Sequence, residues 1–214
     1  FPTVEWTLHF RNTGGANTPI LENIQALDAQ LDRGDLPEFL LHHAVGSPAA
    51  GNDYAPRESL LPPGTTKRVG AAGGRPTNTD WSYFNLEWPV GRGLIVVVGW
   101  PGQWAAEFAR DPGRGLRIRA GQELTRFKLL PGETVRSPLI ALQFWQGDWI
   151  RAQNVWRRWM MAHSMPKPGG KLPPPQFVAS SSRQYDEMIK ANETNQMLFI
   201  DRYVEEGLKL DYGW

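Results

Sequence analysis

The sequence begins with an alternation of apolar and polar residues that is typical of a half-buried β-strand. Val4, Trp6, Leu8 and Phe10 alternate with polar side chains, and successive side chains of a strand point to opposite faces. Further short apolar segments follow, each bounded by Gly, Pro or Asp, as expected for strands joined by turns. These segments are Phe39–Val45, Tyr83–Trp88, Leu94–Trp100, Leu116–Ala120, Glu123–Leu130 and Arg136–Phe144. The pattern predicts a mainly β protein with an antiparallel β-sandwich.

Two early segments give a weaker signal. Residues 20–31 carry apolar residues at helical spacing, but they follow Thr18-Pro19 and lie between expected strands, so helix and strand both stay open. Residues 46–74 are rich in Gly and Pro and predict one long loop. A loop of that length inside a compact domain is usually functional or packed over a surface.

The period of the apolar residues changes after Asp148, which is a good N-cap residue. An apolar face at helical spacing then follows, and Pro166 ends the helix. The residues of this face are Ala152, Trp156, Trp159, Met160 and His163. Residues 165–175 contain five prolines and predict a stiff, extended linker.

A strand, a helix and a second strand are expected beyond the linker. Phe177-Val178-Ala179 is a short apolar segment, residues 192–207 have a helical pattern that ends at Gly207, and Leu208–Trp214 predicts a buried strand. Two strands that are joined by a helix in one sheet are parallel and right-handed. We therefore expect an all-β domain, a connecting helix and the first unit of an α/β domain.

Charge and composition exclude several classes of function. The 214 residues carry a formal net charge of +1, so no basic surplus points to nucleic acid. No apolar run reaches the roughly 18 residues of a membrane-spanning helix. Cysteine is absent, which excludes disulfides and thiolate metal sites and leaves the compartment open. His42 and His43 are adjacent and point to opposite faces of a strand, so no metal site is expected there.

Tryptophan is frequent, with 10 residues in the chain. Such residues are either large core fillers of a β structure or platforms on which sugar rings stack, with the sugar hydroxyls bonded to nearby polar groups. The sequence leaves both interpretations open.

Several short stretches, spread over nearly the whole chain, form a recognisable series. They are Val4-Glu5-Trp6, Thr18-Pro19-Ile20-Leu21, 73–78 (GGRPTN), 83–86 (YFNL), 99–104 (GWPGQW), 130–138 (LPGETVRSP), 153–158 (QNVWRR) and 210–214 (LDYGW). In this order they resemble the α-galactosidases of glycoside hydrolase family 36 and close relatives. No single stretch is decisive, and the specificity comes from their order.

The resemblance implies a layout. Residues 1–146 would be an N-terminal β-supersandwich, 147–175 a connecting helix and Pro-rich linker, and 176–214 the start of a (β/α)₈ barrel that stops in its second strand. Relatives have an Asp-rich turn followed by Gly-Trp after that strand. Asp211-Tyr212 does not match this turn, so we expect the turn beyond Trp214.

The resemblance also implies a chemistry. Family members are retaining glycosidases that use one carboxylate as nucleophile and another as acid and base, without metal or cofactor. Both are Asp residues of barrel strands 4 and 6, so we assign no catalytic residue and expect the fragment alone to be inactive. The implied partners are an α-galactoside-type carbohydrate, the missing barrel portion and a second copy in a homo-oligomer. An extracytoplasmic location fits a polysaccharide-degrading relative.

Some residues are still candidates for contact with substrate. Ser180, Ser181 and Ser182 lie at the C-terminal end of the first barrel strand, where active-site loops begin, and Gln184 and Tyr185 follow them. A helix cap or a turn is the more ordinary interpretation of these residues.

Three further candidates lie elsewhere in the chain. Asp211 lies inside the last strand and needs hydrogen-bonding partners there. Asp53, with its neighbour Tyr54, and Trp81 belong to long loops that in relatives can approach the barrel mouth. A structural role is the more ordinary interpretation of each.

Two other functions fit the sequence. One is a non-catalytic β-sandwich that binds carbohydrate through exposed tryptophans, and the other is a module whose sandwich packs subunits together. Solvent exposure of the tryptophans discriminates between them, because stacking platforms must be exposed.

Overall fold

The computed structural model describes residues 1–88, 91–179 and 190–213. The chain divides into two compact units, Phe1–Trp159 and Met160–Trp214.

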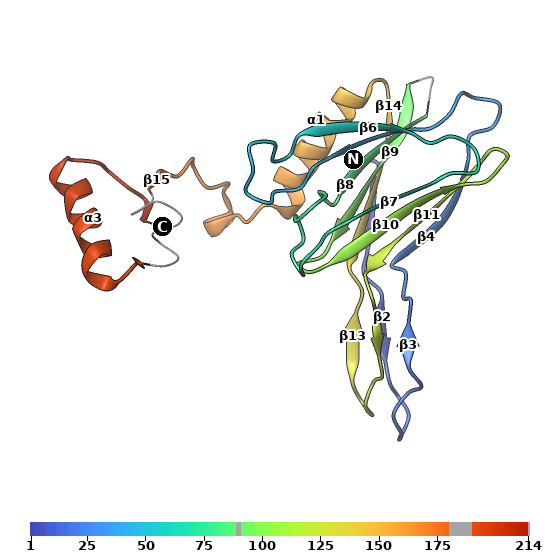
Figure 1. Ribbon diagram of the computed structural model, residues 1–214, viewed down its shortest axis with the longest axis horizontal. Helices are drawn as coiled ribbons and strands as arrows, with labels where there is room; N and C mark the ends of the chain where they lie inside the picture. The colour runs from blue at the N-terminus through green and yellow to red at the C-terminus, as the bar shows by residue number, and fades with distance from the viewer. Residues whose placement is uncertain (89–90, 180–189, 214) are drawn as a thin grey trace. The chain divides into compact units, whose positions relative to one another are not determined.

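The first unit is a β-sandwich of two antiparallel sheets (Figure 1). The larger sheet has the order β1 (Thr3–Trp6), β14 (Leu139–Gln146), β9 (Arg92–Gly99), β8 (Tyr83–Trp88), β5 (Leu40–Ala44) and β6 (Pro56–Leu60). The smaller sheet has the order β4 (Leu27–Asp32), β11 (Gly115–Gln122), β10 (Trp104–Arg110) and β7 (Thr66–Gly70). The antiparallel sandwich that the alternation predicts is confirmed.

The main core lies between the two sheets. Trp104 and Phe108 of β10 pack edge-on against Phe84 of β8, with ring centroids 5.6 Å and 5.5 Å apart. All three side chains are completely buried. Each large aromatic side chain buries a large apolar area and so contributes strongly to the stability of such a sandwich.

A charged residue is buried at one end of β10. The Arg110 side chain is fully buried and pairs with Glu38, with 2.6 Å between Nη2 and Oε2. It also donates hydrogen bonds to the carbonyl oxygens of Leu61 and Gly115. A buried guanidinium is tolerated only when its donors are satisfied in this way.

Two short two-stranded ribbons extend from the sandwich as an arm (Figure 1). Their strands are β2 (His9–Arg11) with β13 (Thr134–Arg136), and β3 (Leu21–Glu22) with β12 (Arg126–Phe127). The buried Asn12 links the ribbons, because its Nδ2 donates to Ala16 O at 2.7 Å and to Leu129 O at 3.0 Å. The turn expected at Leu130–Glu133 is present, with Gly132 at a φ of 80°.

Helix α1 (Trp149–Trp159) contacts the outer face of the larger sheet, at β8, β9 and β14. The predicted N-cap is confirmed, because Asp148 Oδ1 accepts a hydrogen bond from Arg151 N at 2.7 Å. Ala152 packs with Ile95 and Trp145 in a second, smaller core. The helix continues as a π-helical turn, η1 (Met160–Ser164), before Pro166.

The second unit contains a 3₁₀ turn, η2 (Pro168–Gly170), then β15 (Val178–Ala179), α3 (Glu193–Glu205) and β16 (Tyr212–Gly213). The expected strand–helix–strand order is confirmed, and β15 and β16 pair in parallel. Asn192 caps α3 in a capping box, and Gly207 follows its C-cap at a φ of 72°. None of the residues of α3 is buried.

Three sequence predictions need correction, and one segment that was left open is now assigned. The strand expected at 208–214 is neither long nor buried: among the described residues, β16 covers only Tyr212–Gly213, and the elements described around it leave Tyr212 60% exposed. The expected loop 46–74 contains β6 and β7. Residues 20–31, for which helix and strand were both open, contain β3 and most of β4, so the strand interpretation holds. The first strand is divided between β1 and β2, which belong to different sheets.

Candidate functional site

Two loops on one edge of the larger sheet are held together by their backbones. Gly46 N donates to Thr79 O at 3.0 Å, and Ser47 N donates to Thr77 O at 2.6 Å. A Cβ at position 46 would lie 1.8 Å from Thr77 O, so only glycine allows this approach. The contact brings residues 45–55, which follow β5, beside residues 77–81, which precede β8.

Asp53 fastens the first of these loops from within. Its Oδ2 accepts a hydrogen bond from Ser47 Oγ at 2.6 Å, and its Oδ1 accepts one from Ala50 N at 3.0 Å. The bond from Ser47, followed by that from Ala50, lowers the pKa of the Asp53 carboxyl. Because these bonds occupy both oxygens, the side chain fixes the loop that presents Tyr54.

The two loops bring a pair of aromatic rings together at the surface. Tyr54 and Trp81 meet edge-to-face at 5.5 Å, and they are 50% and 39% exposed. Trp81 lies 5.6 Å from Tyr83, and Tyr83 lies 6.1 Å from Trp156 of α1. A continuous row of rings thus leads from the exposed pair to the helix.

A cavity of about 170 Å³ opens beside this row, and we call it the aromatic cleft. Its aromatic lining consists of Tyr54, Trp81, Tyr83 and Trp149, and its polar lining includes His42, Arg57, Glu58 and Gln153. The Tyr83 hydroxyl is buried without a hydrogen-bond partner among the described residues, and burial raises the pKa of this phenol. Apolar rings beside polar groups are the lining that a sugar needs.

His42 joins the cleft to the first turn of α1. Its ring stacks on Trp149 with centroids 4.3 Å apart, and its Nε2 lies 2.8 Å from Glu87 Oε2. Its Nδ1 lies 3.1 Å from Glu58 Oε1. The imidazole thus makes a hydrogen-bond contact with Glu87 through Nε2, while its Nδ1 lies near Glu58 without a hydrogen bond.

The structure brings some of the predicted substrate-contacting residues together and not others. The Asp53 loop and Trp81 meet at the aromatic cleft. Asp211 lies in the second unit, where its Oδ2 accepts a hydrogen bond from Phe177 N at 2.8 Å and its own N donates to Phe177 O at 2.9 Å. These two bonds join the segments that lead into β15 and β16. Ser180, Ser181, Ser182, Gln184 and Tyr185 lie outside the described residues.

Sequence reasoning missed most of the cleft lining, including Tyr83, Trp149 and His42. Tyr83 begins a predicted strand. The alternation along that strand, β8, places Tyr83 on the face that points away from the main core, and this was the signal available in the sequence. Trp149 directly follows the N-cap residue, and its partner His42 was considered only as a metal ligand. Nothing in the local sequence indicates that their rings meet, because 107 positions separate His42 from Trp149.

Comparison with known proteins identifies the fold. No protein-family model matches the sequence, and no curated protein is significantly similar to it. Among solved structures, the α-galactosidase from Lactobacillus brevis superposes with a TM-score of 0.74 over 97% of this chain, at 13% identity. The family 36 α-galactosidase AgaA from Geobacillus stearothermophilus, as a variant in complex with stachyose, has a TM-score of 0.72 over 100% of the chain, at 14% identity. The fold is that of the N-terminal part of family 36 α-galactosidases.

The structural match covers only a part of each relative. The galactosidase domain of AgaSK, an α-galactosidase–sucrose kinase, matches 83% of this chain at 17% identity with a TM-score of 0.68. The chain spans only 28%, 29% and 25% of the three enzymes named. The resemblance indicated by the sequence is thus confirmed at the level of the fold.

Two kinds of feature are missing from the described part of the chain. It contains no helix that is long and apolar enough to span a membrane. It also contains no group of three or more His, Cys, Asp or Glu side chains that could hold a metal ion.

His43, on the strand beside the cleft, makes stability depend on pH. Burial, and then the charge of Lys67, lower its pKa below the ordinary 6.5. The unfolded chain therefore binds more protons, so the stabilisation is complete above pH 6.5 and is lost as the pH falls below it. Urea unfolding at about pH 7.5 and about pH 5 should show this loss, and His43→Gln should reduce it. The exposed His9→Gln variant is the control, and an equal reduction in that variant would contradict the assignment.

Proposed function

We propose that this chain is the N-terminal part of a retaining glycoside hydrolase that acts on terminal α-galactosides. The observation that carries the proposal is the whole-chain structural match to α-galactosidases, one of which is described in complex with stachyose and another with raffinose. Within this proposal, residues 1–146 are the β-supersandwich, 147–175 the connector and 176–214 the start of the catalytic barrel.

The catalytic carboxylates are not assigned to this chain. A retaining mechanism needs two carboxyl groups about 5 Å apart, one as nucleophile and one as acid and base. In the proposed layout both lie on later barrel strands. The role of the present chain is to supply the sandwich, the connector and a sugar-contacting rim at Tyr54 and Trp81.

The experiment compares the 214-residue chain with the product of its complete source reading frame. We expect the complete product to hydrolyse an aryl α-galactoside with retention of anomeric configuration, observed by proton NMR. The 214-residue chain should show no turnover. A reading frame that encodes no barrel would contradict the proposal, and robust turnover by the short chain would overturn the placement of the carboxylates.

Non-catalytic carbohydrate binding is the second candidate function, and one observation favours it. Trp81 is exposed and stands beside the exposed Tyr54. Among the tryptophans within the described ranges, Trp81 alone is exposed, so no coplanar set of platforms is present. Most of the tryptophans are therefore core fillers, and sugar stacking is confined to the cleft.

Trp81→Ala should weaken binding of stachyose to this chain about three- to tenfold, because the indole provides the stacking surface. Isothermal titration calorimetry measures the affinity. Phe144→Ala is the matched control, since Phe144 is also an exposed aromatic residue, 50% accessible, and does not line the cleft. Equal weakening in both variants would rule out a specific role for Trp81.

A further inference from the structure

The outer face of the smaller sheet is hollowed where small residues are aligned across its strands. Ala105 of β10 pairs with Gly121 of β11 and with Gly70 of β7. Beside this row of residues with little or no side chain lies a cavity of about 580 Å³, lined by Ala105 and Gly121 and by the ion-paired side chains of Arg68 and Glu123. We call it the polar hollow. Its volume falls within the roughly 300–1,000 Å³ that is typical of small-molecule sites.

A row of alternating charges borders the hollow on one side. Across the four strands, Arg68, Glu107, Arg119 and Asp28 are aligned in register. Arg119 donates to Glu107, and Arg117 binds both oxygens of Asp28 at 2.7 Å. The bond from Arg117 keeps the pKa of Asp28 below its ordinary value, so the carboxylate is ionised at neutral pH.

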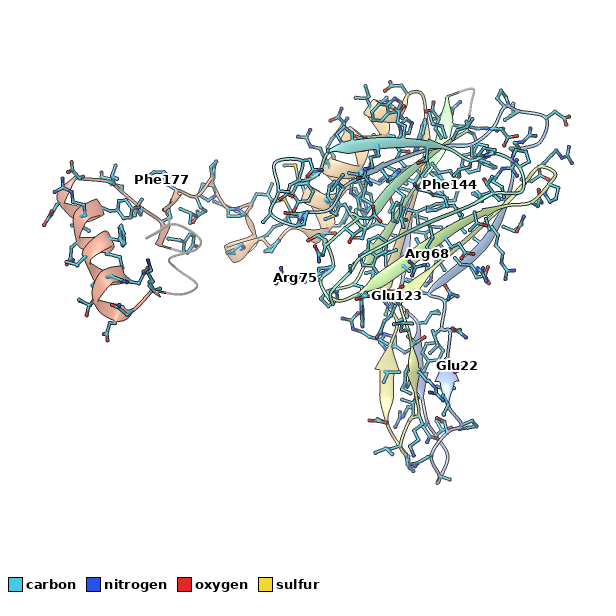
Figure 2. The ribbon with its side chains drawn as sticks, in the orientation of Figure 1. Glu22, Arg68, Arg75, Glu123, Phe144 and Phe177 are labelled. Carbon is cyan, nitrogen blue, oxygen red and sulfur yellow. The ribbon has the colours of Figure 1, made fainter. Side chains whose placement is uncertain are left out.

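A second set of polar groups lies at the other side, and Arg68 of the first row reaches across to it. Glu123 accepts hydrogen bonds from Arg68 and from Gln103, and Gln103 Oε1 in turn accepts one from Gly74 N at 3.0 Å. Figure 2 shows Arg68 and Glu123 beside each other on the sandwich. Side chains that are already held in place lose little conformational entropy when a ligand binds.

The balance of charge indicates what kind of ligand fits. Each acidic group named above is matched by an arginine, so the hollow has neither the single-sign field that attracts an ion nor an apolar wall for a hydrophobic ligand. It offers charged donors beside charged acceptors. A hydroxyl group both donates and accepts, and bonds to charged partners are stronger than bonds between neutral groups.

We propose that the polar hollow binds a neutral, hydroxyl-rich saccharide, with Arg119 and Arg68 donating to its hydroxyl oxygens and Glu107 and Glu123 accepting from its hydroxyl groups. This site lies on the outer face of the smaller sheet, whereas the aromatic cleft lies on the larger sheet, and the inference does not depend on the proposed enzymatic activity.

The experiment is a calorimetric titration of the 214-residue chain with stachyose, a neutral oligosaccharide. Ala105→Tyr fills the floor of the hollow, and Ala109→Tyr is the matched control on the same face of the same strand, opposite Thr66 and Arg117. Both are made in the Trp81→Ala background, so that binding at the aromatic cleft is weakened equally in the two variants. Ala105→Tyr should weaken binding at least tenfold, and Ala109→Tyr should leave the affinity unchanged.

A second variant tests the hollow without adding a large side chain to it. Glu107→Gln preserves the shape of the hollow and removes a charged acceptor, and it should weaken stachyose binding several-fold. Thermal unfolding verifies that each variant is folded. The affinity of the Trp81→Ala chain should change little as sodium chloride is raised, because the ligand carries no charge.

Three results would overturn the inference. The first is complete loss of stachyose binding in Trp81→Ala alone, which would leave the aromatic cleft as the binding site. The second is an Ala105→Tyr variant that is folded and binds like Ala109→Tyr. The third is tighter, salt-sensitive binding of inorganic sulfate than of stachyose to the hollow, which would identify an anion site.

Discussion

Trp104→Ala is expected to lower the free energy of unfolding by about 3–5 kcal/mol. The indole is completely buried between the sheets and packs against Phe84. Its Nε1 also donates to Pro76 O at 2.7 Å and so holds the loop that precedes β8. Alanine would leave a large cavity and an unpaired carbonyl oxygen. Urea unfolding, followed by far-ultraviolet circular dichroism, measures the change.

Ile20→Ala provides the control for this prediction. Ile20 lies outside the sandwich core and is 55% exposed, so its truncation should change the unfolding free energy by no more than about 0.5 kcal/mol. A loss below about 1 kcal/mol for Trp104→Ala would show that the two sheets do not pack around this side chain.

Glu38→Ala should cost about 3 kcal/mol, because it leaves the guanidinium of Arg110 buried without its carboxylate. The Arg110 side chain has no solvent exposure, and Glu38 also lies 3.2 Å from Arg33. The remaining partners of Arg110 are backbone carbonyl oxygens, which carry no charge, and the Asp111 carboxylate, whose Oδ1 lies 3.5 Å from Nη1 on a side chain that is 47% exposed. Equilibrium urea unfolding at neutral pH measures the loss.

A nearby surface pair supplies the comparison. Asp35 lies 3.2 Å from Arg114, and the Asp35 side chain is 98% exposed. Asp35→Ala should therefore cost less than about 1 kcal/mol. The double variant Glu38→Ala with Arg110→Met should recover part of the loss, since methionine removes the buried charge. The explanation would be contradicted if the two substitutions were additive, so that the double variant is less stable than Glu38→Ala by the full cost of Arg110→Met measured alone.

Several elements were accessible from the sequence because their signals are local. The predicted strand Tyr83–Trp88 is β8, residue for residue, since its apolar residues fill the core on one face. Asp148 marks the start of one helix because its side chain accepts a hydrogen bond from a backbone N–H of the first turn, and Gly207 marks the end of the other by its positive φ. Both signals depend only on neighbouring residues. The parallel pairing of β15 and β16 follows from the strand–helix–strand order.

Other elements were missed because their signals are weak or misleading. Strand β10 alternates correctly, but alanines occupy three of its seven positions and give little hydrophobic contrast. Strand β6 is an edge strand with Arg57 and Glu58 in its centre, so it resembles a loop. An edge strand can be polar because its faces and its free edge meet water.

The candidate site was anticipated only in part. Asp53 and Trp81 were selected as residues of long loops, and the structure places the Asp53 loop and Trp81 at one cleft. The side chain of Asp53 is occupied within its own loop, and the exposed ring beside Trp81 is that of Tyr54. Loop residues can be chosen from sequence, but the partners of their side chains cannot.

The sequence by itself determined the antiparallel sandwich, the two helices with the Asp148 N-cap and the Gly207 end, and the order of motifs that resembles family 36 α-galactosidases. These properties depend on local periodicity, on turn chemistry and on short stretches of residues. Only the tertiary structure decided which tryptophan is exposed, which charges are buried, and that Ala105 and Gly121 are aligned at a hollow. The physical reason is that exposure, ion pairing and cavities depend on strand register and on contacts between residues far apart in the chain, and local sequence patterns do not encode those contacts.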